Sequence, residues 1–323
     1  MAGKSPSGYH LSKKLLIGGE GGWDYLVVDD AARSLYVTHN DRVHVLNADT
    51  LDFIGVVSKT EGVHGVAIAG ELGRGFTSNG RTSTVSIFDL KTLKVVKEVA
   101  VGKNPDAIRF DPFSKRIFVF NGVSHDASVI DAATGEVIAT IPLGGKMEFS
   151  VADGLGHVYA NNEDTSEVMV IDSKNLKVLS RWPIAPGESP TGLSIDTKNR
   201  RLFSVTRNKF MIVLDADDGR VLASLPIGIG CDGCMFDPER KLVFASNGEG
   251  TLTIVHEDSP LNFSILDTVA TQRGARTMTI DLRTHALFLP TAEYGSTPQP
   301  TADQPRPRPP VLPNTFVLLQ FQK

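Results

Sequence analysis

A hairpin pattern recurs seven times along this 323-residue chain, and the repeat constrains the fold more than any other feature. Each copy has a short apolar segment, a turn that usually contains Asp, and a second apolar segment, as in IRFDPFSKRIFVFN from Ile108. The turns start at Asp29, Ala69, Asp111, Asp153, Asp196, Asp237 and Asp281. A period of about 40 residues is typical of units that cannot bury their own faces and must stack on their neighbours.

Each repeat also contains two further β-rich segments, such as VSIFDLKTL and VVKEVAVG in the second repeat. These segments end in turns rich in Asp, Asn, Gly, Ser and Thr. No helical periodicity longer than two turns interrupts them. Four short antiparallel strands per repeat are typical of a propeller blade. The sequence therefore predicts an all-β fold, a seven-bladed β-propeller with four strands per blade, as a single domain over residues 1–323.

The two ends of the chain predict how the ring closes. The seventh repeat supplies two strands, a proline-rich insertion at 295–314 and a third strand at 315–321, so its fourth strand is missing. The N-terminal segment 10–19 matches the fourth-strand pattern, and we expect it to complete the last blade and remove two exposed sheet edges. The insertion could cover the channel mouth, offer a docking segment or brace the outside of the last blade.

One tetrapeptide connects the repeat to a known family. Tyr36-Val37-Thr38-His39 differs by one residue from the Tyr-Val-Thr-Asn signature of YVTN-repeat propellers, and the chain resembles YncE-like members of that family along its length. The resemblance implies a seven-bladed propeller that is often exported. We expect a periplasmic or secreted protein whose signal peptide is absent from the sequence, with a cytoplasmic protein as the alternative. The resemblance implies no single activity, because propellers host many functions.

Composition narrows the classes of partner. The formal net charge is −4, and no run of Lys or Arg exceeds two residues, so we expect no nucleic-acid partner. No apolar run approaches the roughly 18 residues of a membrane span, so we expect no membrane insertion. The expected partner is a small molecule or a protein ligand.

The register of the repeat predicts which side chains line the mouth of the central channel. Five residues before the turn starts lie Asp24, His64, Asp106, Glu148, Thr191, Asp232 and Arg276. His39 ends a second strand where the other repeats have Asn or Thr, so it reaches the same face. We predict a binding site formed by Asp24, His39, His64, Asp106, Glu148, Glu163, Arg207, Asp232 and Arg276.

Two histidines and a carboxylate from adjacent blades suggest a metal site within this set. His39, His64 and Asp24 are the predicted ligands of one divalent transition metal ion, with Glu148 and Glu163 able to complete the shell. The alternative is that both histidines only bind loop backbone. We expect His256 and His285, near turns on the opposite face, to lie at the surface.

Three other residue sets leave alternatives open. Cys231 and Cys234 could be redox-active, metal-binding, disulfide-bonded or free, although a redox pair normally opens a helix and this pair leads into a strand. Trp23 and Tyr25 could pack between blades or form a ligand wall. Arg207 and Arg276 could bind a carboxylate or phosphate, or neutralise neighbouring glutamates.

Three function classes are compatible with these features. The first is an exported propeller that binds a small molecule, a metal ion or a protein partner at the polar mouth. The second is a hydrolase of lactone type, with His39, His64, Glu148 and Arg276 at a metal or His/carboxylate site. The third is a pure protein-interaction scaffold that uses the rim and the proline-rich insertion.

Overall fold

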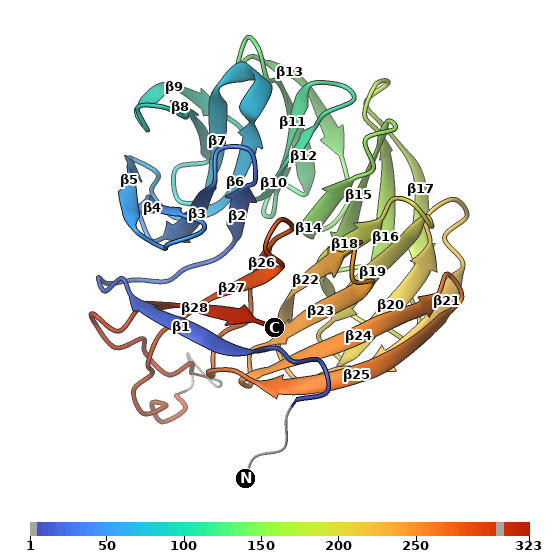
Figure 1. Ribbon diagram of the computed structural model, residues 1–323. Coiled ribbons are helices and arrows are strands. Elements are labelled where there is room, and N and C mark those ends of the chain that lie inside the picture. The colour runs from blue at the N-terminus through green and yellow to red at the C-terminus, as the bar shows by residue number, and fades with distance from the viewer. Residues whose placement is uncertain (1–4, 302–306) are drawn as a thin grey trace.

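A computed structural model describes residues 5–301 and 307–323 of the chain. Within these ranges, seven four-stranded antiparallel sheets are arranged as blades around a central channel (Figure 1). The prediction of a seven-bladed all-β propeller is confirmed. From the inside outward, the first three blades contain β2 (Leu26–Asp29), β3 (Ser34–His39), β4 (Arg42–Asn47) and β5 (Phe53–Ser58); β6 (Val63–Ala69), β7 (Arg74–Asn79), β8 (Thr84–Asp89) and β9 (Val95–Ala100); and β10 (Pro105–Asp111), β11 (Arg116–Asn121), β12 (Asp126–Asp131) and β13 (Val137–Pro142).

The remaining blades continue this order, except that the N-terminal strand is the outermost strand of the last one. They contain β14 (Met147–Ala152), β15 (His157–Asn162), β16 (Glu167–Asp172) and β17 (Lys177–Pro183); β18 (Pro190–Asp196), β19 (Arg201–Thr206), β20 (Phe210–Asp215) and β21 (Val221–Pro226); β22 (Cys231–Asp237), β23 (Leu242–Asn247), β24 (Thr251–Ser259) and β25 (Asn262–Ala270); and β26 (Thr279–Asp281), β27 (Ala286–Thr291), β28 (Val317–Gln322) and β1 (His10–Leu16).

Hydrophobic burial divides the core into seven clusters, one between each pair of adjacent blades in the described residues. The middle strands are almost wholly buried, as in β11 and β15, because blades cover both of their faces. The outermost strands, such as β17, alternate between exposed and partly buried residues, since one face of each lies in solvent. Stacking of neighbours, expected from the repeat, therefore supplies the core.

The Asp-containing hairpins on one face of the ring are structural turns. Asp111 accepts hydrogen bonds from the backbone N–H groups of Phe113 (3.3 Å) and Ser114 (3.0 Å), a local pattern that favours turns. The second blade has Ala69 at this position and turns instead through a short 3₁₀ helix, η1 (Gly70–Leu72). That helix ends at Gly73, whose φ of 63° lies in the left-handed region that glycine adopts readily.

The surface position expected for His285 is wrong. His285 is buried, and its Nδ1 lies 2.7 Å from Asp237 Oδ2 in the neighbouring blade. The turn of the last blade packs against blade six at this point, a contact that register along the chain does not reveal. His256 is partly exposed and pairs with Asp258 at 2.7 Å.

The N-terminal strand closes the ring as predicted. β1 pairs with β28 in antiparallel register, from His10 opposite Gln322 to Leu16 opposite Val317. Tyr9, directly before β1, is fully buried between blades six and seven. Its hydroxyl donates to the carbonyl of His285 at 3.0 Å, and its ring meets Phe244 edge-on with centroids 5.1 Å apart.

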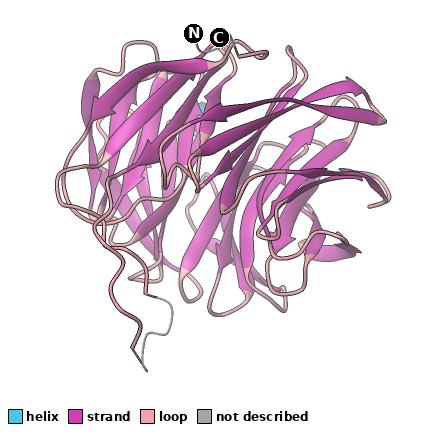
Figure 2. Cartoon of the chain, turned by 90° about the horizontal axis from the view of Figure 1, so that it is seen from below, coloured by secondary structure: helices cyan, strands magenta, loops and turns pink. Residues whose placement is uncertain are grey.

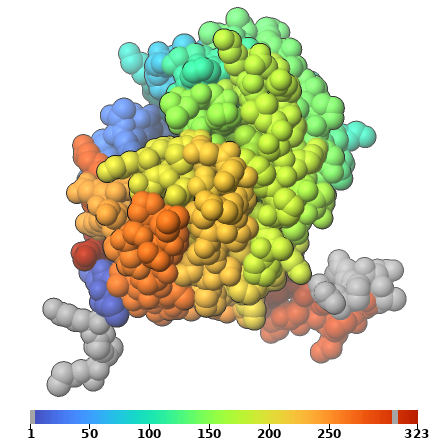
Figure 3. Space-filling model, turned by 90° about the vertical axis from the view of Figure 1, so that its right-hand side faces the viewer, coloured from blue at the N-terminus to red at the C-terminus, as the bar shows by residue number. Residues whose placement is uncertain are grey.

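The two faces of the ring differ in what they carry. Figure 2 shows the two ends of the described chain together at one face, and residues 295–301 and 307–314 of the proline-rich insertion projecting from the opposite face. The same segment stands out from the blades, in orange-red, in Figure 3. Its two legs pair with each other, since the Gly295 N–H donates to the Pro310 carbonyl (2.9 Å) and the Leu312 N–H donates to the Glu293 carbonyl (2.9 Å). Pro305, one of its seven prolines, lies outside the described residues.

Candidate binding site at the channel mouth

The polar mouth is built where the inner strands begin. In five blades the register between the inner strand and its neighbour shifts near the start of the strand, as between Val63 and Gly65 in β6 and between Cys231 and Gly233 in β22. A bulge of this kind re-aims side chains and interrupts the pairing. The second residues of these five strands are His64, Asp106, Glu148, Thr191 and Asp232. In the other two blades, Asp24 and Arg276 lie just before the inner strand.

All seven residues line one cavity of about 380 Å³. Lys146, Arg207 and Arg308 line it as well. The structure therefore brings together seven of the nine predicted binding residues, and Glu163 joins them through ion pairs with Lys146 (3.0 Å) and Arg207. His39 does not reach this cavity. The role of the cavity residues in binding a ligand stays a prediction.

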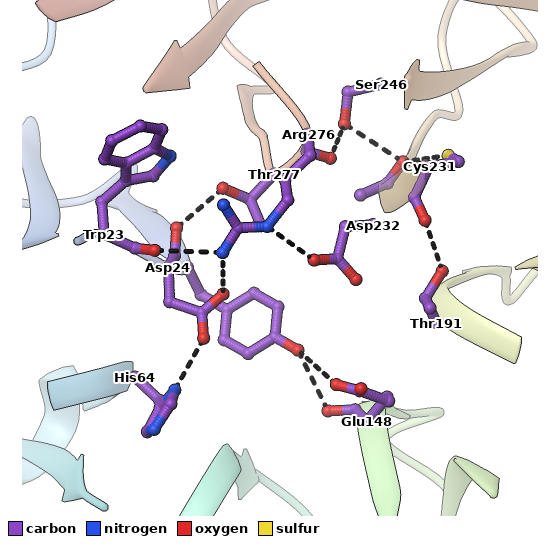
Figure 4. A network of polar contacts seen from close by, with 12 residues as sticks. Trp23, Asp24, His64, Glu148, Thr191, Cys231, Asp232, Ser246, Arg276 and Thr277 are labelled. Carbon is purple, nitrogen blue, oxygen red and sulfur yellow. Dashed lines mark hydrogen bonds and ion pairs between the residues drawn. The ribbon is translucent and has the colours of Figure 1, made fainter. Parts of the chain in front are cut away.

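Arg276 holds one side of the mouth together (Figure 4). Its Nε donates to Asp232 Oδ2 at 2.9 Å, and its Nη2 donates to the carbonyl of Trp23 at 3.2 Å and lies 3.8 Å from Asp24 Oδ1. Burial lowers the pKa of Arg276, but the charges of Asp24 and Asp232 outweigh it, and the net shift is upward. The alternative that the arginines neutralise mouth carboxylates therefore holds for Arg276, with aspartates as its partners.

A second charged cluster occupies the side of blades four and five. Lys146 Nζ contacts Glu148, and Arg207 lies 3.4 Å from the same carboxylate. Burial, together with the hydrogen bond to Glu163, raises the pKa of Glu148. The pKa of Glu163 is lowered despite burial, by hydrogen bonds from Glu148 and Lys146. Burial therefore favours the protonated form of Glu148, and Glu163 is the more acidic of the two carboxyl groups.

Three residues from blades one, two and three form the tightest cluster of potential metal ligands among the described residues: Asp24, His64 and Asp106. His64 Nδ1 lies 2.7 Å from Asp24 Oδ2 and 3.7 Å from Asp106 Oδ1. Ligand atoms from the three side chains all lie within 4.8 Å of one another. One histidine nitrogen and two carboxylate oxygens at this separation can converge on a divalent transition metal ion.

The electrostatics of this cluster leave one acceptor unsatisfied. Asp106 is 5% exposed, and its Oδ1 has no hydrogen-bond partner among the described residues. Burial raises the pKa of Asp106 to about 7, against the opposing effect of His64. Burial also disfavours the charged form of His64, but the hydrogen bond to Asp24 and the charge of Asp106 raise its pKa to about 9. A buried carboxylate oxygen without a hydrogen bond is costly, and a bound cation would remove that cost.

The backbone of blade two orients His64. A Cβ at Gly80 would lie 2.7 Å from His64 Nε2, so this nitrogen faces main chain and only glycine fits there. Nδ1 consequently points toward the two aspartates. Asp24, His64 and Arg276 also line a second cavity, of about 390 Å³, beside the mouth.

His39 is a correction to the predicted metal set. Its ring is 3% exposed and stacks on Phe316 with centroids 4.1 Å apart, in the contact between blades one and seven. Its Nδ1 lies 3.4 Å from His44 Nε2, and Nε2 has no partner among the described residues. The strand end does lie on the mouth face, but the side chain points sideways into the neighbouring blade. His39 therefore lies apart from His64 and Asp24, and the residue that clusters with these two is Asp106.

His39→Asn is expected to lower the free energy of unfolding by about 1 to 3 kcal/mol, because it removes a buried aromatic stack and leaves a gap at Phe316. This loss of stability is larger than the loss expected if His39 only bound loop backbone. Urea denaturation of the variant and of a His10→Asn control, in exposed β1, measures it. An unchanged midpoint for His39→Asn would contradict the packing role.

The same residue predicts a loss of stability in acid. Burial, followed by His44 and Arg42, lowers the pKa of His39 to about 4, below the value of about 6.5 in an unfolded chain. The unfolded state therefore binds more protons between these values, and the stability from neutral His39 is complete above about pH 6.5 and lost as the pH falls toward 4. Melting curves at pH 4.5 and 7.5 should differ less for His39→Asn than for the wild type. Equal changes in melting temperature for the variant and the wild type would rule out His39 as a source of the acid sensitivity.

Tyr25 and Trp23 have different roles. Trp23 packs in the core between blades one and seven, with its ring centroid 5.3 Å from that of Phe316. Tyr25 reaches across the channel to blade four, where its hydroxyl donates to the backbone carbonyl of Glu148 at 3.2 Å. Tyr25 also lines a lower cavity and so lies between the two halves of the channel. Packing between blades thus describes Trp23, and Tyr25 forms the floor of the mouth.

The cysteine pair is free and buried. Cys231 and Cys234 are 2% and 1% exposed and form no disulfide. Cys234 Sγ lies 3.2 Å from Ser194 Oγ, and burial raises its pKa to about 12. Burial also raises the pKa of Cys231. Neither thiol has the environment of a reactive thiolate.

Both thiols are therefore expected to resist a thiol reagent such as dithionitrobenzoate in the native protein. The reagent needs a thiolate, and both groups are protonated and enclosed. Two equivalents should react after denaturation in guanidinium. Labelling of either cysteine in the folded protein within seconds would contradict the buried, neutral assignment.

The sequence did not identify Arg308 as part of the site. It lies in the proline-rich insertion, is exposed, and lines the mouth cavity. The available signal was that the insertion leaves from the end of a second strand and hence from the mouth face. Of the three roles expected for the insertion, this position favours a contact with the channel mouth.

Fold and site together define a class: a seven-bladed β-propeller with a polar cavity at one end of its channel. No helix of the described residues is long and apolar enough to cross a membrane. No family model matches the chain. Among curated proteins the chain is similar to the uncharacterized protein YncE of Escherichia coli O157:H7, with 24% identity over 147 residues. That match spans 42% of this chain and about two fifths (41%) of the relative.

Solved structures extend the likeness in fold to nearly the whole chain. The chain is similar to Kuenenia stuttgartiensis hydrazine synthase, with a TM-score of 0.73, 15% identity, and coverage of 87% of this chain and 94% of that chain. It is also similar to the WD40 repeats of RRP9, with a TM-score of 0.79, 10% identity, and coverage of 97% and 100%. At these identities the likeness shows the fold alone. The curated match and the seven-bladed architecture support a YncE-like propeller family.

Proposed function

We propose that this chain is a binding propeller whose ligand site is the polar mouth of the channel. The observation that carries the proposal is the convergence of one polar side chain from every blade on one cavity, where Asp106 Oδ1 is buried without a hydrogen-bond partner. Buried polar atoms are normally hydrogen-bonded, so a buried carboxylate oxygen without a hydrogen bond, on a residue that lines a cavity, is a candidate ligand-binding group.

The ligand that the geometry favours is one divalent transition metal ion. Asp24, His64 and Asp106 offer two oxygens and one nitrogen, the donor set of many catalytic and binding sites for zinc-like ions. An ion at His64 Nδ1 would replace the proton that Asp24 and Asp106 now stabilise. Its two positive charges would also balance the negative charges of the two carboxylates.

A second candidate function, a hydrolase of lactone type, is supported by the neighbouring carboxyl pair. Burial raises the pKa of Glu148, which favours a protonated carboxyl group there, and Lys146 links Glu148 and Glu163 to the metal cluster, since its Nζ lies 4.0 Å from Asp106 Oδ2. A proton donor next to a Lewis acid is a combination used in hydrolysis. Export to the periplasm or the extracellular space, implied by the family resemblance, remains part of the proposal.

Metal analysis of protein purified without a histidine tag tests the proposal. Stoichiometric zinc, nickel, cobalt or manganese in the protein, retained on gel filtration, would support a metal-binding propeller. Hydrolysis of lactones or esters by the loaded protein, absent after chelation, would assign the second function. Absence of metal binding with any of these ions at micromolar concentration would refute the metal ligand.

A further inference from the structure

The lower half of the channel contains a third cavity, separate from the mouth. It has a volume of about 360 Å³ and lies below Tyr25, toward the face of the Asp hairpins. Its wall is mainly apolar and includes Phe110, Phe149, Leu193, Ile195, Met235 and Phe236. Sites for small organic ligands are typically apolar cavities of about 300 to 1,000 Å³ with few polar groups. The mouth residues and the metal proposal make no use of this space.

One charged side chain, Arg109 in β10, projects into this apolar cavity. Its Nε donates to the carbonyl of Ser150 at 2.9 Å, and its guanidinium group lies 5.3 Å from the ring centroid of Phe149. The other four N–H donors of the guanidinium have no hydrogen-bond partner among the described residues. They are not sealed within protein, because Arg109 is partly accessible from the channel.

Arg109 also lacks a counter-ion. No carboxylate of the described residues pairs with it, whereas Arg33 on the hairpin face pairs with Asp281 and Arg276 at the mouth pairs with Asp232. Burial alone lowers its pKa, to about 10, so the group is still charged at neutral pH. A cation set in an apolar wall without a counter-ion is unfavourable, and it favours an anion placed against it.

We infer that the lower channel binds a small amphipathic carboxylate, with its carboxylate on the Arg109 guanidinium and its apolar body along the wall formed by Phe110, Phe149 and Leu193. A planar guanidinium binds a carboxylate through two parallel hydrogen bonds, and Arg109 has free donors for that geometry. The apolar wall excludes fully polar anions, because it would leave their other groups without partners. Short-chain and medium-chain fatty acids match both requirements.

Octanoate and octanol are the probes that separate the contribution of the ligand's carboxylate from that of its apolar chain. Isothermal titration should show one octanoate bound per chain, and Arg109→Met should weaken octanoate binding at least tenfold while weak octanol binding persists. Arg74→Met is the matched control, since Arg74 also donates only to backbone carbonyls but lies outside the channel. This control should bind octanoate like the wild type.

Two outcomes would overturn the inference. One is equal octanoate binding by the wild type and Arg109→Met, or none by either protein. The other is a melting temperature of Arg109→Met several degrees below that of the wild type, because this would show that the fold itself satisfies Arg109. The inference expects the unliganded variant to melt at or above the wild-type temperature, since it removes an unpaired buried charge.

Discussion

Removal of residues 1–19 is expected to lower the melting temperature by about 10 °C or more. The deletion removes β1, which forms the full outer edge of blade seven, and so leaves β28 as an unpaired edge. It also removes Tyr9, which is 0% exposed and packs between blades six and seven. Loss of a buried aromatic side chain alone typically costs about 3 to 5 kcal/mol.

Variants of Tyr9 separate the stability that its buried side chain contributes from the stability that strand β1 contributes. Tyr9→Ala should reproduce a large part of the loss, whereas Tyr9→Phe keeps the contact with Phe244 and loses only the hydroxyl bonds to Arg240 and the His285 carbonyl. Calorimetry of the deletion and of both Tyr9 variants gives the three melting temperatures. If the deletion melts within about 2 °C of the full chain, β1 does not close the ring in solution.

His64→Ala and Asp106→Ala are each expected to weaken binding of a divalent transition metal ion by at least about 100-fold. Each variant removes one of three ligands, and two remaining ligands rarely retain such an ion. His39→Asn is the matched control from the same face, because His39 packs on Phe316 and contributes no ligand. Competition against a chromogenic chelator measures the affinities.

Without bound metal, loss of the Asp106 carboxylate should not lower the melting temperature. Asp106→Asn removes a buried carboxyl group with an unpartnered oxygen, so its melting temperature without metal should equal or exceed that of the wild type. A metal affinity unchanged in His64→Ala would refute the site. Loss of metal binding in His39→Asn would restore the ligand set expected from the sequence.

The repeat predicted the fold because every blade carries the same local information. Asp111 and its counterparts mark one turn per blade, and the missing last strand matches the unassigned segment that forms β1. The same register located the ring of mouth residues, since a fixed offset from the turn reaches the same height in each blade. Regular spacing along the chain therefore predicts both the blades and the height of the mouth residues.

The finer points of the site depend on contacts between blades, which spacing along the chain does not encode. His39 lies at the predicted height but points into blade seven. Asp106 was placed at the mouth, yet its approach to His64 depends on a bulge in β10 and on the curvature of the ring. Arg109 resembles any strand arginine in the sequence, and only the structure shows that no carboxylate in residues 5–301 and 307–323 pairs with it.

Anomalous diffraction from crystals soaked in a zinc salt tests the central claim most directly. Data collected above the zinc absorption edge should show one strong peak in the mouth, about 2.0 to 2.2 Å from His64 Nδ1 and from one oxygen each of Asp24 and Asp106. The peak should vanish in crystals of Asp106→Ala. No peak in the mouth, or a peak that persists unchanged in that variant, would contradict the account.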